Sequence, residues 1–113
     1  MFRVSYGSKY GNISAEHNGI QYHSKKEAAY AAELDLRIKA GDIKSWKRQV
    51  CIGIKINKCH ICNYYIDFVV THNDGVKEYI EVKGFETDVW KLKWKMFEAL
   101  YSKRKNTKLT IIK

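Results

Sequence analysis

The sequence contains no proline, only three cysteines and no long apolar run. Because proline, internal repeats and low-complexity tracts are all absent, nothing marks a linker, and we expect residues 1–113 to form one domain. An odd number of cysteines does not suit a closed disulfide framework and is normal for reduced thiols. The start, MFRVSYG, lacks the apolar stretch of a signal peptide. We therefore expect a cytoplasmic protein with no membrane partner.

Acidic residues are also scarce. Asp and Glu number 12 against 21 Lys and Arg, which gives a formal net charge of +9. Such an excess predicts a polyanionic partner, and nucleic acid is the expected one. A membrane surface is the alternative, but no basic amphipathic tail supports it. Apolar residues make up 45% of the chain and aromatic residues 13%, which is enough to close a core and excludes disorder.

Hydrophobic patterning predicts the order helix, three strands, helix, strand. Residues 1–23 are rich in Gly, Ser, Asn and Tyr and are expected to form an N-terminal arm or a loose hairpin. A helix is predicted over residues 24–41, begun by a capping box of Ser24 and Glu27 and ended by Gly41. The later strands and the second helix are predicted over residues 44–56, 61–71, 76–83, 88–102 and 107–113. This order indicates a single α/β domain with an α-β-β-β-α-β core, in which helices flank a mixed sheet.

Each predicted helix carries one charged residue within its apolar face. Ala31, Leu34 and Ile38 share a stripe of the first helix, and Glu27 lies at its centre, so we expect Glu27 to point inward. The second helix has Asp88 as the expected N-cap and Lys93 in the middle of its apolar face. That face is expected to contain Val89, Trp90, Met96, Phe97, Leu100 and Tyr101.

Two carboxylates and a lysine lie on the second and third predicted strands. Asp67 interrupts the apolar run YYIDFVV, while Glu81 and Lys83 are about 7 Å apart on one face of the next strand. A three-residue loop at 73–75, a type I turn closed by a left-handed Gly75, would bring all three side chains to one face. A four-residue loop would put Asp67 on the opposite face, and the glycine position favours the shorter loop. The backbone pairs expected from it are Thr71 with Lys77, Val69 with Tyr79, and Asp67 with Glu81.

Carboxylates on adjacent strands would form an oxygen cage for Mg²⁺, which also takes water and substrate phosphate as ligands. Bound metal acidifies water and neutralises phosphate charge, and Lys83 could hold that water or stabilise a developing phosphorane. Glu27 could complete the acidic site. Each residue also has a structural interpretation: Asp67 as a local cap or salt bridge, Glu81 and Lys83 as a solvated strand face, Glu27 as part of the capping box. The occurrence of all four together favours the functional interpretation.

Four stretches in order resemble the PD-(D/E)XK nuclease superfamily, and more closely a small phage-borne family within it that has been assigned to Holliday-junction resolvases. They are KYGN (9–12), NGIQYHSKKEA (18–28), YIDF (65–68) and EVKGFETDVWKLK (81–93). The resemblance covers nearly the whole chain. It implies a restriction-endonuclease-like core, a DNA endonuclease that acts on branched DNA in phage recombination or replication, a homodimer, and a bacterial host cell if the protein is phage-encoded.

The same resemblance assigns roles by position. Asp67 and Glu81 would bind metal together with the Val82 carbonyl, Glu27 would complete the acidic site, and Lys83 would orient or activate the water. The metal would be Mg²⁺, with Mn²⁺ as the alternative. One departure is Ile66, which precedes Asp67 where the superfamily name has proline, a position that varies widely.

Basic residues are spread along the chain rather than gathered in one block. The expected DNA contacts are Lys9, Lys25, Lys47, Arg48, Lys91 and Lys93, with Lys26, Lys95 and residues 102–105 as further candidates. Lys93 should reach the site or a phosphate there, or else extend past the helix edge. Because no groove-reading motif is evident, backbone and shape contacts are expected rather than base readout.

Cysteines and tryptophans allow two other functional interpretations. Cys59-His60-Ile61-Cys62 suggests zinc, but Cys51 and His60 would both have to join and a second CxxC is missing, so reduced thiols are expected instead. Trp46, Trp90 and Trp94 could stack on bases, but the helical spacing of the last two favours the core.

Three functions are consistent with the sequence. The leading hypothesis is a Mg²⁺-dependent endonuclease that cuts branched DNA as a two-fold dimer. The second is a related nuclease that nicks, trims ends or cuts as restriction enzymes do. The third is a non-catalytic nucleic-acid-binding module that retains only the fold.

Overall fold

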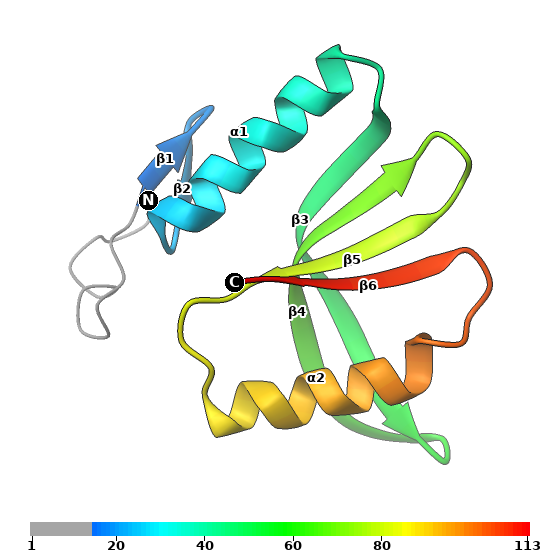
Figure 1. Ribbon diagram of the computed structural model, residues 1–113. Coiled ribbons are helices and arrows are strands. Elements are labelled where there is room, and N and C mark those ends of the chain that lie inside the picture. Colours follow the sequence, from blue (N-terminus) through cyan, green and yellow to red (C-terminus); the bar gives the residue numbers. More distant parts are fainter. Residues whose placement is uncertain (1–14) are drawn as a thin grey trace. The chain divides into compact units, whose positions relative to one another are not determined.

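The computed structural model describes residues 15–113, and the chain divides into two compact units, residues 1–42 and 43–113 (Figure 1). Lys9, the KYGN stretch and the first part of the expected arm lie outside the described residues. Neither helix in the described part of the chain combines the length and apolarity needed to span a membrane.

The described part of the first unit is a hairpin followed by a helix. Strands β1 (Ala15–His17) and β2 (Ile20–Tyr22) pair antiparallel, and α1 spans Lys25–Lys39. The hairpin turn consists of Asn18 and Gly19, which both have positive φ, as a two-residue turn between twisted strands requires. His17 Nε2 lies 2.6 Å from Asp35 Oδ2, and the Asn18 side chain donates to the same oxygen at 2.8 Å. These contacts anchor the hairpin to α1.

Both predicted ends of α1 are confirmed. Ser24 Oγ accepts a hydrogen bond from the Glu27 backbone N–H at 3.1 Å, and Gly41 has φ +80° just beyond the last turn. The expected inward position of Glu27 is also confirmed, because its side chain is buried along with Ala31 and Leu34. The apolar stripe ends earlier than predicted, since Ile38 remains 38% exposed.

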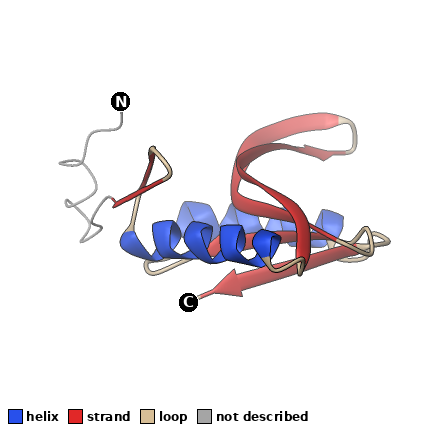
Figure 2. Cartoon of the chain, turned by 90° about the horizontal axis from the view of Figure 1, so that it is seen from above, coloured by secondary structure: helices blue, strands red, loops and turns tan. Residues whose placement is uncertain are grey.

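The second unit is a mixed four-stranded sheet with one helix (Figure 2). The order in the sheet is β3-β4-β5-β6, in which β6 runs parallel to β5 and the other neighbours are antiparallel. The strands are β3 (Ile43–Ile56), β4 (Cys59–His72), β5 (Lys77–Val82) and β6 (Thr107–Ile112), and α2 spans Asp88–Tyr101. Because a parallel pair needs a crossover, α2 connects β5 to β6. The predicted α/β class, element order and mixed sheet are therefore confirmed.

The core of this unit lies between α2 and one face of the sheet. Trp94 and Phe97 of α2 are buried in it with side chains from β3 and β4, namely Ile52, Ile54, Tyr64, Ile66 and Val69. The predicted apolar face of α2 was wrong at two positions, because Val89 and Leu100 are 64% and 38% exposed. The buried stripe follows Trp94 and Phe97 instead. The helix is therefore rotated so that Val89 and Leu100 face away from the core.

The predicted N-cap of α2 was also wrong. Thr87, and not Asp88, is the N-cap: its backbone is extended and its Oγ1 accepts the Trp90 backbone N–H at 3.1 Å. Asp88 is the first helical residue, where its charge complements the positive end of the helix dipole.

The predicted β4–β5 register is confirmed over most of its length. Thr71 pairs with Lys77 and Val69 with Tyr79. Gly75 has φ +91°, and its amide donates to the His72 carbonyl at 3.0 Å, as the expected three-residue loop requires. The ladder ends at Phe68 and Ile80, however, so the expected backbone pair of Asp67 with Glu81 is absent from it.

Candidate active site

Asp67 lies at an irregularity in the pairing of β3 with β4. The ladder passes from Arg48 opposite Phe68 to Val50 opposite Ile66, with no regular pair between them. At that position Gln49 has φ +50°, a conformation that residues other than glycine rarely adopt. Both strands advance by two residues across this step, so it is a local irregularity of the ladder without an extra residue. Residues 66–70 are all buried, although simple alternation would expose every second one.

Two hydrogen bonds fix the Asp67 carboxylate. Its Oδ2 accepts the backbone N–H of Val82 on β5 at 2.9 Å, and its Oδ1 accepts from Gln49 Nε2 at 3.4 Å. Asp67 thus occupies the place where the β4–β5 ladder would have continued, and its side chain replaces a backbone acceptor. This contact holds Asp67 beside the end of β5.

Glu81 is the adjacent carboxylate and is only 1% exposed. Tyr64 Oη donates to Glu81 Oε1 at 2.5 Å. Burial raises the pKa of Glu81 to about 9, with further increases from the charge of Asp67 and a hydrogen bond to it, partly offset by Tyr64 and Lys83. The two carboxylates therefore meet as predicted, and with no metal bound a proton on Glu81 relieves their repulsion.

Aromatic side chains connect Glu81 to Lys83. The indole Nε1 of Trp90 donates to Tyr64 Oη at 3.0 Å, and Lys83 Nζ lies 4.8 Å from the centroid of the Trp90 ring. Burial and the Glu81 charge raise the pKa of Tyr64 far above its usual range, so Tyr64 remains a hydrogen-bond donor. The cation–π contact holds the Lys83 ammonium group beside the acidic pair, as the sequence predicted.

The acidic pair has the chemistry of a divalent-cation site. Neither Asp67 nor Glu81 forms a salt bridge with any residue in 15–113. Two adjacent, buried carboxylates without a salt bridge suit a metal ion, whose charge would replace the proton on Glu81. No cluster of three or more His, Cys, Asp or Glu side chains exists in the described part of the chain. A pair of carboxylates would suit an ion that fills its other positions with water and phosphate, as Mg²⁺ does.

The other two expected metal ligands are the Val82 carbonyl and Glu27. The Val82 backbone N–H belongs to the site through its bond to Asp67, and its carbonyl stays a predicted ligand. Glu27 belongs to the first unit, at the start of α1, so its predicted role beside Asp67 and Glu81 also stays a prediction.

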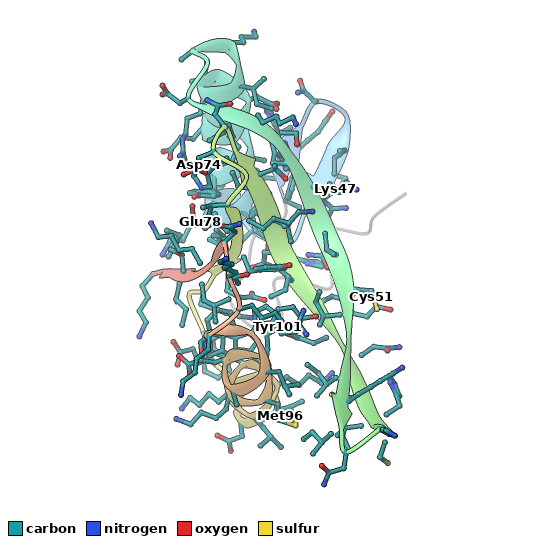
Figure 3. All side chains as sticks on the ribbon, turned by 90° about the vertical axis from the view of Figure 1, so that its right-hand side faces the viewer. Lys47, Cys51, Asp74, Glu78, Met96 and Tyr101 are labelled. Carbon is teal, nitrogen blue, oxygen red and sulfur yellow. The ribbon has the colours of Figure 1, made fainter. Side chains whose placement is uncertain are left out.

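The expected DNA contacts occupy several elements. Lys25 and Lys91 are exposed on α1 and α2, while Lys47 is exposed on β3 and Arg48 is half-buried there (Figure 3). Lys93 points at the sheet as expected, but its Nζ donates to the Asn63 carbonyl of β4 at 3.2 Å. This bond couples α2 to the β3–β4 hairpin.

The cysteines are free, with Cys51 and Cys59 exposed and Cys62 half-buried, and the expected absence of zinc stays a prediction. Trp94 is buried as expected, whereas Trp90 is half-buried and belongs to the hydrogen-bond chain at Glu81.

A second polar cluster, which the sequence did not indicate, crosses β4, β5 and β6. Glu78 is 7% exposed, its Oε1 lies 2.7 Å from His72 Nε2, and its Oε2 accepts from Thr110 Oγ1 at 2.6 Å (Figure 3). Burial alone would raise the pKa of Glu78, but the Thr110 and His72 hydrogen bonds and the charge of Lys108 hold it below its usual value. The cluster ties three adjacent strands together.

Three residues of the site went unrecognised in the sequence: Tyr64, Gln49 and the indole of Trp90. Tyr64 and Trp90 have the spacing of core aromatics, which carries no sign of a polar role. Only Gln49 carried a signal, because a glutamine in a β-branched run is out of place.

A family model described as "Protein of unknown function (DUF1064)" matches residues 7–113. No curated protein and no solved structure matches the chain. Because the match spans the second unit and the described part of the first, it includes the acidic pair, Lys83 and Glu27. The chain belongs to the DUF1064 family.

Proposed function

We propose that the protein is a metal-dependent endonuclease that hydrolyses phosphodiester bonds in DNA, preferentially at four-way junctions. The observation that carries this proposal is the buried pair of Asp67 and Glu81, which forms no salt bridge within residues 15–113 and lies beside Lys83. A carboxylate pair that served only stability would be expected to have a salt-bridge partner, because burying a charge without one is costly. A metal ion and a phosphate group would together complete such a site.

The roles of the side chains follow from their contacts. A bound Mg²⁺ would supply charge neutralisation and a more acidic water. Val82 N–H and Gln49 hold Asp67 in place, while Tyr64 donates a hydrogen bond to one Glu81 oxygen. Lys83, held over Trp90, would orient the attacking water or stabilise negative charge that develops on the phosphate.

The preference for junctions and the homodimer rest on the resemblance to the phage-borne resolvases and on the charge of +9. A four-way junction has two strands to cut and two-fold symmetry, whereas each chain supplies one pair of carboxylates. Two chains related by a two-fold axis would therefore provide the two sites.

The test is cleavage of a labelled four-way junction and a matching linear duplex, with Mg²⁺ or EDTA. Asp67→Asn and Glu81→Gln remove a negative charge at nearly constant volume, and each should lower the rate at least about 100-fold. The control is Asp88→Asn, which removes the same charge from the start of α2, outside the acidic pair, and should cut like the wild type.

Metal-dependent cutting of the junction, lost in both site variants and kept in the control, would support the proposal. Cutting of linear duplex or flaps instead would favour a related nuclease with another substrate. Binding without cutting, equal in all four proteins, would overturn the nuclease proposal in favour of a binding module.

A further inference from the structure

The hairpin of β3 and β4 extends well beyond the rest of the sheet. Strand β4 pairs with β5 only from Phe68 to Thr71, whereas its pairing with β3 continues to Cys59 opposite Ile56. We call residues 53–63 the ribbon. The views of Figures 1 and 3 agree that its tip projects past α2.

The ribbon is anchored to α2 at its base. Its turn residues, Asn57 and Lys58, have φ +52° and +66°, which is the two-residue turn that matches the twist of the strands. Ile54 is fully buried next to α2, so the inner side of the ribbon is held. The hydrogen bond from Lys93 to the Asn63 carbonyl is a second contact between the ribbon and α2.

Charge along this hairpin has one sign. Between Asp42 and Asp67 the sequence contains no acidic residue, but five Lys and Arg. All residues from Lys55 to Ile61 are exposed. Lys55 lies directly opposite His60, a pairing of basic groups that adds nothing to the stability of a hairpin.

Apolar side chains accompany these basic groups. Ile56 and Ile61 are 42% and 48% exposed. The ladder passes from Ile54 opposite Cys62 to Lys55 opposite His60, so Ile61 is an extra, bulged residue. Exposed isoleucines at the tip of the ribbon, among basic groups, suit contact with the edges of bases.

We infer that the ribbon enters the major groove of duplex DNA, where Lys55 and Lys58 contact phosphates and Ile56 and Ile61 contact base edges. The major groove admits a two-stranded ribbon, and thymine methyl groups there offer apolar contacts. The inference rests on the proposed function for the choice of DNA as the polyanion. It adds a binding element that is separate from the acidic pair.

The test measures binding in EDTA, so that it does not depend on cleavage. The full chain is titrated against a fluorescent duplex at several salt concentrations. The double variant Lys55→Gln/Lys58→Gln should reduce the salt slope by about 2 and the affinity about 10–100-fold at 0.1 M salt. Lys39→Gln/Lys77→Gln removes the same charge from exposed positions on α1 and β5 and serves as the matched control, with a smaller effect on both quantities.

A second measurement identifies the groove. Methyl green, which occupies the major groove, should displace the protein, whereas netropsin in the minor groove should not. Equal binding by both double variants, or displacement by netropsin alone, would overturn the inference. If the ribbon variant loses binding but the wild type never cuts DNA in Mg²⁺, the ribbon stands and the nuclease proposal fails.

Discussion

Glu81 makes the stability of the metal-free protein depend on pH. Its pKa is about 9 in the folded protein, against an ordinary value of 4.5 in an unfolded chain. Between these values the folded protein holds one more proton than the unfolded chain. The free energy of unfolding therefore decreases as pH rises through this window, by at most about 1.4 kcal/mol per pH unit.

Glu81→Gln should abolish this dependence, because glutamine keeps the acceptor for Tyr64 and does not titrate. In EDTA, the wild type should lose stability relative to the variant from pH 5 to pH 9, measured by urea unfolding. Glu98→Gln, at an exposed position on α2, provides the control and should follow the wild type. Parallel curves for wild type and Glu81→Gln would show that Glu81 is ionised in the folded protein.

At the scale of the elements, the start of α2 sets the position of Trp90 and so of its hydrogen bond to Tyr64. Thr87 accepts the Trp90 backbone N–H. Thr87→Ala should therefore lower the free energy of unfolding by about 1 kcal/mol, as the loss of an N-cap does. Asp88→Ala removes only a charge near the helix dipole and should cost less. Urea unfolding of both variants decides between them, and a larger loss in Asp88→Ala would restore Asp88 as the cap.

How far an element can be predicted depends on whether its signal is local. The β4–β5 register was predictable because Gly75 fixes the loop length, and the register then brings Asp67 and Glu81 together. The rotation of α2 about its axis could not be predicted, because Val89 is as apolar as the buried residues of that helix. Only packing against the sheet determines which of these apolar residues are buried.

The site itself was predictable only in part, for a similar reason. Carboxylates are unusual within apolar strands and can therefore be recognised in the sequence. Tyr64 and Trp90 are not unusual at their positions, since aromatic residues are common in strands and helix cores. Their polar atoms acquire a role only through the crossover that brings α2 next to β4.

At the scale of the whole molecule, one acidic pair per chain limits what a single copy can do. A monomer that nicks a junction once leaves it unresolved, and the second cut must wait for another encounter. Under the proposed function, a pair of chains bound together would make both cuts within one complex. Because the junction is two-fold symmetric, the same contacts would serve each half, and the interface would be isologous.

We therefore expect two chains on each four-way junction. Light scattering after size-exclusion chromatography, with Asp67→Asn protein in Mg²⁺, should give the mass of two chains plus one junction. On a supercoiled plasmid with an extruded cruciform, the wild type should yield linear rather than nicked circular product. Mixing wild type with excess Asp67→Asn should shift that product to nicked circles, because a mixed pair has one competent site. A complex of one chain per junction, or nicked circles from wild type alone, would contradict the two-fold arrangement while leaving the chemistry of the acidic pair untouched.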